Sequence, residues 1–342
     1  MSLPLMHTPM PDLLQPTLDV RNLTTRFDSR AGIATAVNDV SFSVMPGQIM
    51  GLVGESGSGK SMTGYSIMGL IDPPGHVTGG EVLFKGEDLR ELNPEKMRAI
   101  RGDRIAMIFQ DPMMTLNPVL RIDTQMIETV MAHHPVSRDT ARAMSCDALA
   151  QVGIASPRER LLAYPHQFSG GMRQRVAIAI ALLNKPDLII CDEPTTALDV
   201  TIQGQILFEM QKLCRESGTA LIWITHDLSV VAGLADTVCV MYAGRIVESG
   251  TVQQVLDAPR HPYTFGLIAS APSRNLRGQP LRQIPGMTPS LLNLPNGCAF
   301  RTRCERATDQ CSTQPPLTVV AGHTLRCFHP MPVMPGDQEA GA

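Results

Sequence analysis

The sequence predicts an α/β fold with a helical insertion and a small, irregular C-terminal extension, and three observations support this prediction. First, a short apolar run at residues 48–53 leads directly into a glycine-rich loop and then into a helix-permissive stretch at 61–70. This order of strand, loop and helix is the repeating unit of α/β proteins. Second, apolar runs of strand length follow at residues 187–191, 220–225 and 237–242. Third, apolar residues between 112 and 165 recur at helical spacing, as at Ile122, Met126 and Val130.

The remaining elements follow in chain order. Residues 17–23 and 37–44 alternate apolar and polar side chains, which predicts two half-buried strands ahead of the glycine-rich loop. Residues 104–109 and 245–248 predict further strands, whereas the two ends of the chain lack such periodicity. We therefore expect a flexible tail at residues 1–16, a main domain at 17–258 with its helical subdomain at about 112–165, and a separate extension at 259–342.

The composition argues against several classes of protein. With 43% hydrophobic residues the chain can bury a core, so a disordered protein is not expected. The net charge of -3 and the pI near 6.3 give no general attraction to nucleic acid or to an anionic membrane surface. No apolar run is long enough to span a bilayer, and the first residues do not resemble a secretory signal. We expect the protein to remain in the cytoplasm and to reach a membrane only through a partner.

The glycine-rich loop fits the phosphate-binding pattern G-x-x-x-x-G-K-[ST]. Its glycines allow backbone N–H groups to turn toward a polyanion, and the helix that follows adds its N-terminal donors. Lys60 is expected to reach the β- and γ-phosphates of a nucleotide, and the Ser61 hydroxyl to bind Mg²⁺. The alternative is a glycine-rich turn followed by a chance Lys–Ser pair. The predicted nucleotide-binding residues of the loop are Gly54, Glu55, Ser56, Gly57, Ser58, Gly59, Lys60, Ser61 and Met62.

A second candidate site lies at the end of the apolar run 187–191. Asp192 and Glu193 follow this run, and ligands bind at the carboxyl ends of the strands in open α/β sheets. Asp192 is placed to hold Mg²⁺, and Glu193 is placed to polarise an attacking water. A solvated acidic turn is the alternative, but the phosphate loop upstream favours a functional role. Together the two sites predict a P-loop ATPase that uses ATP and Mg²⁺.

Another pair of glycines precedes an apolar, alanine-rich stretch at 176–183. Ser169 is a good N-cap for a helix that begins there, and Gly170 and Gly171 allow close approach of an anion. One nucleotide is not easily held by two such helix starts within a single chain. We therefore expect a head-to-tail dimer in which each chain closes over the ATP of the other.

The ordered set of these motifs resembles the ATP-binding cassette (ABC) family over residues 18–250. The resemblance implies a P-loop NTPase fold, with a RecA-like core, an antiparallel β subdomain and a helical insertion. The matching motifs are the phosphate loop, Gln110, the Ser-Gly-Gly sequence at 169–171, Asp192–Glu193, Ala197–Leu198–Asp199 and His226.

The resemblance also implies roles for residues in the chain's own nucleotide site. Phe27 would stack on adenine, and Gln110 would sense Mg²⁺ and the γ-phosphate and couple the site to a membrane subunit. Glu193 would be the catalytic base, and His226 would contact the γ-phosphate. Simpler interpretations remain for single residues: Phe27 as a core aromatic, Gln110 as a turn cap, and His226 as an ordinary loop histidine.

Other matching residues would act across a dimer. Ser169, Gly170 and Gly171 would contact the γ-phosphate bound by the partner, and Asp199 would lie at the dimer seam. The sequence departs from the family pattern at Met172, where many cassettes have glutamine. A methionine there cannot donate a side-chain hydrogen bond, whereas the backbone donors of the two glycines are unaffected.

Several motifs resemble one branch of the family, the oligopeptide/dipeptide permease ATPases, which includes nickel and glutathione importers. The resemblance implies an importer subunit for di-/oligopeptides, or for nickel, glutathione or another small solute. It also implies peripheral attachment to the cytoplasmic face of the inner membrane. The implied partners are a second, non-identical ATPase, two transmembrane permease subunits and an extracytoplasmic binding protein. The motifs lie at residues 110–112, 116–118, 164–167, 261–264 and 294–298.

Two other functional classes predict features that the sequence does not have. A cassette ATPase that acts on nucleic acid or the ribosome predicts tandem cassettes, a coiled coil or a basic surface, and the sequence has none of these, so no nucleic-acid partner is expected. A non-catalytic regulatory partner predicts a degenerate site, but Lys60 and Glu193 are both present.

Four of the eight cysteines lie in the C-terminal extension, at Cys298, Cys304, Cys311 and Cys327. In a reducing compartment such a group predicts metal ligation rather than disulfides. Four thiolates suit a 4Fe-4S cluster or a tetrahedral Zn²⁺, and the resemblance to dipeptide-permease ATPases implies the cluster. The spacings are also wider than the C-x₂-C pairs of structural zinc. His323 and His329 keep a mixed zinc site open, and unligated thiols are the third alternative.

Overall fold

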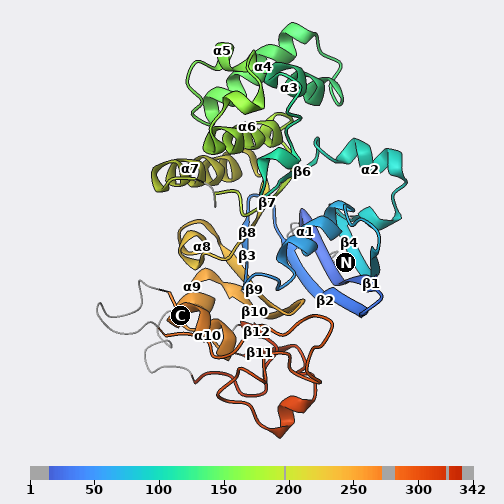
Figure 1. Ribbon diagram of the computed structural model, residues 1–342, viewed down its shortest axis with the longest axis vertical. Helices are drawn as coiled ribbons and strands as arrows, with labels where there is room; N and C mark the ends of the chain where they lie inside the picture. The colour runs from blue at the N-terminus through green and yellow to red at the C-terminus, as the bar shows by residue number, and fades with distance from the viewer. Residues whose placement is uncertain (1–14, 196–197, 272–281, 321–322, 333–342) are drawn as a thin grey trace, which may run out of the picture.

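The computed structural model describes residues 15–195, 198–271, 282–320 and 323–332, which form two β-sheets surrounded by helices (Figure 1). The expected tail at 1–16 lies almost entirely outside these residues. The first sheet is antiparallel and has the strand order β2-β1-β4-β5. Its strands are β1 (Leu18–Ser29), β2 (Gly32–Val44), β4 (Gly75–Phe84) and β5 (Glu87–Asp88).

Both β1 and β2 extend beyond the ranges expected from alternation, which were 17–23 and 37–44. The register of β1 against β2 shifts between Val20 and Leu23 and again on either side of Thr25. Each such irregularity changes which side chains face the core, so the simple alternation of the sequence breaks while the strand continues.

The second sheet has the order β11-β12-β10-β9-β3-β8-β7-β6. Strands β9, β3, β8, β7 and β6 run parallel, and β10 pairs antiparallel with β9 and with β12. The parallel strands are almost completely buried, as expected for a sheet covered on both faces. Their bounds are β3 (Ile49–Val53), β6 (Ile105–Ile108), β7 (Leu188–Asp192), β8 (Ala220–Thr225) and β9 (Thr237–Tyr242), followed by β10 (Arg245–Thr251), β11 (Thr318–Val320) and β12 (His323–Leu325).

The structure contains ten described α-helices and several short 3-10 turns. The upper lobe in Figure 1 contains α3, α4 and α5, which lie within the helical stretch expected at about 112–165, and also α6, which follows that stretch; α1 follows β3 directly. Within the described ranges, none of the helices combines the length and apolar character needed to cross a bilayer. The α-helices are α1 (Lys60–Met68), α2 (Pro94–Ile100), α3 (Ile122–Met131), α4 (Arg138–Gln151), α5 (Pro157–Leu161), α6 (Gly170–Leu182), α7 (Val200–Ser217), α8 (Leu228–Leu234), α9 (Val252–Asp257) and α10 (Pro262–Ala269). Short 3-10 turns are η1 (Leu89–Glu91), η2 (Pro112–Met114), η3 (Pro165–Gln167) and η5 (Asp309–Ser312).

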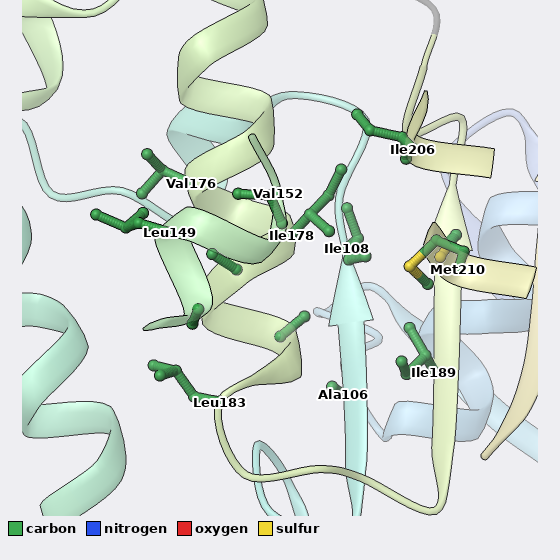
Figure 2. Close-up of a cluster of buried hydrophobic side chains, with 14 of the residues drawn as sticks. Ala106, Ile108, Leu149, Val152, Val176, Ile178, Leu183, Ile189, Ile206 and Met210 are labelled. Atoms are coloured by element: carbon green, nitrogen blue, oxygen red, sulfur yellow. The ribbon is translucent and has the colours of Figure 1, made fainter. Parts of the chain in front are cut away.

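A large apolar cluster fixes the helical subdomain to the edge of the second sheet. Figure 2 shows Ile178 of α6 next to Ile108 of β6 and Leu149 of α4 farther from that strand, and all three belong to one buried cluster. On the other side of β6, Ile189 of β7 and Met210 of α7 complete the cluster. Because α6 packs directly on the strand that ends before Gln110, the subdomain and the sheet edge share one core.

The C-terminal extension differs from the irregular, separate piece that the sequence predicts. It contains α10, and its β11–β12 hairpin continues the second sheet, with Leu325 of β12 paired with Glu248 of β10. The hairpin strands have three residues each, too few to show an alternating pattern. The eight-residue α10 begins at a proline, after the His261 side chain accepts a hydrogen bond from the Tyr263 N–H.

A buried carboxylate holds the extension to the sheet. Glu248 of β10 is completely buried and accepts hydrogen bonds from the backbone N–H groups of Arg260 (2.7 Å) and His261 (2.9 Å). Its Oε1 also lies 2.8 Å from Nδ1 of His323 on β12. One side chain thus ties the start of α10 and the hairpin to β10.

Replacing Glu248 with alanine should therefore destabilise the protein strongly. The change leaves two buried N–H groups and the His323 ring without their acceptor, and we expect a loss of roughly 3 kcal/mol in the free energy of unfolding. Chemical denaturation of the full chain measures the loss. The control is Glu216→Ala at an exposed position on α7, which should change stability by less than about 0.5 kcal/mol. Equal effects of the two substitutions would contradict the role given to Glu248.

Candidate functional site

The predicted site residues follow four parallel strands that lie side by side. In the order β3, β8, β7 and β6, the strands lead into the loop at 54–59, into His226, into Asp192–Glu193 and into Gln110. Because neighbouring parallel strands end at the same edge of a sheet, these segments meet there, although they are distant in sequence. The sheet order therefore gathers the residues of both predicted sites in one place.

The loop between β3 and α1 requires glycine at two positions because other backbone segments press against it. Gly54 has φ 155° and Gly59 has φ 104°. A Cβ at Gly54 would lie 2.2 Å from the Met241 carbonyl oxygen, and one at Gly59 would lie 2.2 Å from that of Ala36. The α1 helix begins without a side-chain cap, as expected where N-terminal donors face a ligand. The buried Ser58 hydroxyl has no hydrogen-bond partner within the described residues.

Lys60 is the buried cation of this loop. Its Nζ donates to the carbonyl oxygens of Gly54 (2.8 Å) and Glu55 (3.0 Å), and the residue is only 5% exposed. Burial lowers the pKa of Lys60, against the opposing effect of Glu193, Asp192 and Glu55. A polyphosphate in the loop would favour the charged form of this amine.

Asp192, at the end of β7, is positioned for a divalent cation. It is 1% exposed, and its Oδ1 accepts a hydrogen bond of 2.8 Å from the Ser61 hydroxyl. Burial raises the pKa of Asp192, against the lowering effect of the Ser61 hydrogen bond. A carboxylate beside a hydroxyl supplies the oxygen ligands that Mg²⁺ prefers, so the two side chains fit the predicted metal site.

Glu193 is the centre of the predicted catalytic group. One carboxylate oxygen accepts a hydrogen bond of 3.3 Å from Nε2 of Gln110, and the other lies 3.0 Å from Nδ1 of His226. Its backbone has φ 46°, in the left-handed region that a residue with a Cβ rarely adopts. Such strain is typical of functional sites, where the surrounding structure holds a side chain in a set direction. The structure thus brings the three predicted catalytic residues together.

The residues predicted to act across a dimer lie elsewhere. Ser169 caps α6, since its hydroxyl oxygen accepts a hydrogen bond of 3.3 Å from the Met172 N–H, and both Ser169 and Gly170 are exposed. The α6 helix belongs to the upper lobe in Figure 1, apart from α1. Asp199 is also exposed and caps α7 by accepting a hydrogen bond of 3.0 Å from the Ile202 N–H. Ala197, of the same motif, lies outside the described residues.

Phe27, predicted to hold adenine, is partly buried near the end of β1. Its ring lies against the backbone of β4, where a Cβ at Gly75 would approach Cε1 of Phe27 to 2.4 Å. A small residue at this point leaves room for the ring.

Sequence reasoning did not predict two further contacts of the site. Gln174 of α6 is buried, and its Nε2 donates to the Phe109 carbonyl oxygen at 3.5 Å, next to Gln110. Glu55, in the phosphate loop, forms an ion pair of 2.7 Å with Arg303 of the extension. Burial raises the pKa of Glu55, but the hydrogen bonds from Arg303 and Thr288 and the charge of Arg303 hold it below its usual range. No sequence motif connects the two partners of either contact, because they lie far apart in the sequence.

The four cysteines of the extension line one small cavity, together with His261 and His329. Burial is the main cause that raises the pKa of Cys298, Cys304 and Cys327, the last to about 12, and the nearby thiols add to it. Within the described part of the chain, however, no three His, Cys, Asp or Glu side chains form a group that could hold a metal ion. The cysteines therefore converge as predicted, but the expected metal-binding character of the extension is not supported by this geometry.

Comparisons with known proteins agree with the geometry. The family model described as ABC transporter matches residues 37–196, and the model described as oligopeptide/dipeptide transporter, C-terminal region, matches 247–311. The chain is 48% identical to the oligopeptide transport ATP-binding protein OppD of Haemophilus influenzae, over 92% of this chain and 97% of that protein. It is 47% identical to the probable D,D-dipeptide transport ATP-binding protein DdpD of Escherichia coli, over 92% and 96%. A dimeric ATP-binding cassette solved in a post-hydrolysis state with ADP and phosphate superposes with a TM-score of 0.63, at 27% identity, over 69% of this chain and 98% of that one.

The crowding around the loop predicts different costs for two glycine substitutions. Gly57 and Gly59 both have positive φ, but a Cβ at Gly57 would meet nothing within 4 Å. We expect Gly57→Ala to cost about 1 kcal/mol of unfolding free energy from backbone strain alone, and Gly59→Ala roughly 3 kcal/mol, because the Ala36 carbonyl must also move. Denaturant titration of both variants measures the difference. Similar losses in the two variants would show that the contact with Ala36 carries no cost.

Proposed function

This chain belongs to the ABC transporter family of ATPases, and from that premise we propose that it is the ATP-hydrolysing subunit of an importer for di- and oligopeptides. Its similarity to OppD and DdpD over almost their whole lengths supports the peptide class. Nickel, glutathione or another small solute of the same branch is the alternative cargo. In this proposal residues 17–258 are the ATPase domain and residues 259–342 its extension.

The observation that carries the catalytic proposal is the position of Glu193 between Gln110 and His226, beside the phosphate loop. The loop binds the phosphates of ATP, with Lys60 at the β- and γ-phosphates and Phe27 against adenine. Ser61, Asp192 and Gln110 would hold Mg²⁺, which neutralises phosphate charge when bound. Glu193 accepts the proton of the attacking water, while His226 holds this carboxylate and contacts the γ-phosphate.

A dimer completes the proposed site. Ser169 and Gly170 are exposed at the start of α6, so the backbone donors there are available to a nucleotide on another chain. We place Ser169, Gly170 and Gly171 against the γ-phosphate bound by a partner ATPase, with Asp199 at the seam between the two. A solved cassette of similar fold is itself dimeric. Closure of the dimer on ATP, and its opening after hydrolysis, would drive the transport step.

The assembly follows from the same premise. We propose that the partner ATPase is a second, non-identical chain, and that two transmembrane permease subunits dock near Gln110 and the helical subdomain. An extracytoplasmic binding protein would deliver the solute. The ATPase would then act at the cytoplasmic face of the inner membrane, held there by the permease subunits.

The cysteines of the extension are proposed to bind a 4Fe-4S cluster. A single Zn²⁺ needs four ligands within about 2.3 Å of one point, whereas the thiolates of a cluster each bind a different iron. The four cysteines that line the small cavity supply the thiolates that a cluster needs, and their sequence spacings are wider than the C-x₂-C pairs of structural zinc. Cys298, Cys304, Cys311 and Cys327 would hold it, and the ATP chemistry does not pass through it.

Replacing Glu193 with glutamine tests the catalytic proposal. The amide keeps the size of the side chain but cannot accept the proton of water, so hydrolysis should fall by about two to four orders of magnitude while ATP binding persists. Phosphate release from the reconstituted transporter and binding of a fluorescent ATP analogue measure the two effects. Glu216→Gln on the exposed side of α7 is the matched control. Unchanged turnover in the Glu193 variant would refute its role.

Anaerobic purification tests the cluster proposal. We expect a brown protein with broad visible absorption and about four iron and four sulfide per chain. Cys311→Ser should remove the absorption, and Cys146→Ser, on α4 and away from the cavity, should not. A colourless protein with about one zinc per chain would favour the alternative metal, and one with no metal would favour free thiols.

A further inference from the structure

Glu55 places a negative charge in a loop that must hold a polyanion. The loop runs from Gly54 to Ser61, and the Glu55 side chain is 27% exposed. A free carboxylate at this position would repel the phosphates and attract Lys60, whose Nζ already donates to the Glu55 carbonyl oxygen at 3.0 Å. Neutralising this charge and directing it away from the phosphates would favour binding of a nucleotide.

The C-terminal extension neutralises it. Arg303 faces Glu55 with two nitrogens, Nη1 at 2.7 Å from Oε2 and Nη2 at 3.0 Å from Oε1, which is the bidentate geometry of the strongest arginine–carboxylate pairs. The Arg303 side chain is only 4% exposed, and its Nε donates to the Pro285 carbonyl oxygen at 2.9 Å. The Thr288 hydroxyl donates to the same carboxylate at 2.8 Å.

The extension also holds the backbone of the loop. The Glu55 N–H donates to the Tyr263 hydroxyl at 2.8 Å. Tyr263 is fully buried at the start of α10, and its ring centroid lies 4.6 Å from that of Tyr242 and 5.4 Å from that of Phe300. Side chain and backbone of one loop residue are therefore fixed by three residues of the extension.

We propose that the extension is a positioning element of the nucleotide site, and that Arg303 sets the affinity for ATP by keeping Glu55 neutralised and away from the phosphates. This inference rests on the proposed binding of ATP by the loop. Arg303 touches no reacting atom; it acts through Glu55, as a positioning residue. It directly precedes Cys304, one of the cysteines that line the small cavity.

Suppression of one substitution by another tests this inference. Arg303→Met leaves the Glu55 carboxylate without its cationic partner, and we expect the dissociation constant of a fluorescent ATP analogue and the KM for ATP to rise about tenfold, with little change in kcat. Adding Glu55→Gln removes the repelling charge, so the double variant should bind within about threefold of the unmutated chain. Arg303→Lys keeps the positive charge but loses the bidentate geometry, so its affinity for the analogue should lie between that of Arg303→Met and that of the unmutated chain.

Arg326 offers a matched control. It also belongs to the extension, directly precedes a cysteine of the cavity, and pairs with a carboxylate of the ATPase domain, Asp39 of β2, at 2.7 Å. Arg326→Met should lower the melting temperature as Arg303→Met does, but it should leave the affinity for ATP unchanged. Equal losses of affinity in both variants would show a merely structural role for Arg303.

Two outcomes separate this inference from the function on which it rests. Lys60→Ala should abolish binding of the analogue. If it does, and Arg303→Met binds as tightly as the unmutated chain or is not restored by Glu55→Gln, the positioning role is wrong while the ATP site stands. If Lys60→Ala binds as well as the unmutated chain, the proposed nucleotide site itself is wrong. Should Arg303→Met not fold, the comparison of Arg303→Lys with Arg303→Lys/Glu55→Gln decides the question in the same way.

Discussion

The nucleotide site depends on the register of four parallel strands, which places their carboxyl ends next to one another. Val53 of β3 pairs with Thr225 of β8, Ile224 of β8 with Asp192 of β7, and Cys191 of β7 with Ile108 of β6. The chain therefore leaves all four strands at nearly the same height. The loops that follow converge without any long detour, and a slip of one residue in β7 would turn Asp192 to the opposite face of the sheet. The pairing of the buried, apolar strands thus fixes the positions of the polar side chains that follow them.

Charge balance is the second requirement of the site. Three carboxylates lie in or beside the phosphate loop, and different side chains contact each of them. Arg303 pairs with Glu55, the Ser61 hydroxyl contacts Asp192, and Gln110 and His226 contact Glu193. Glu55 has a fixed, charged partner, whereas Glu193, the proposed catalytic base, is contacted by an amide and by a histidine ring.

The sequence predicted what is encoded locally. The strand–loop–helix unit, the helical stretch after Pro112 and the cap at Ser169 each depend on a few adjacent residues, and the structure contains them. The resemblance places Glu193 and His226 in one nucleotide site, although neither residue alone distinguishes a catalytic group from a polar loop residue, and the structure adds the 3.0 Å contact between Glu193 Oε1 and His226 Nδ1. The full length of β1 and the β11–β12 hairpin were missed, the first because bulges break its alternation and the second because its strands are so short. Arg303 was missed because its partner lies 248 residues away and an isolated arginine has no pattern.

Several interactions join the extension to the rest of the chain, and they end in different parts of it. The hairpin pairs with β10, and Glu248 holds the start of α10, so both support the outer part of the second sheet. Between β10 and the phosphate loop lie β9 and β3, whose buried pairing resists small displacements. The Arg303–Glu55 pair instead ends inside the loop itself. The Arg303–Glu55 pair and the hydrogen bond from the Glu55 N–H to the Tyr263 hydroxyl therefore connect the extension with the phosphate loop directly, without passing through the sheet.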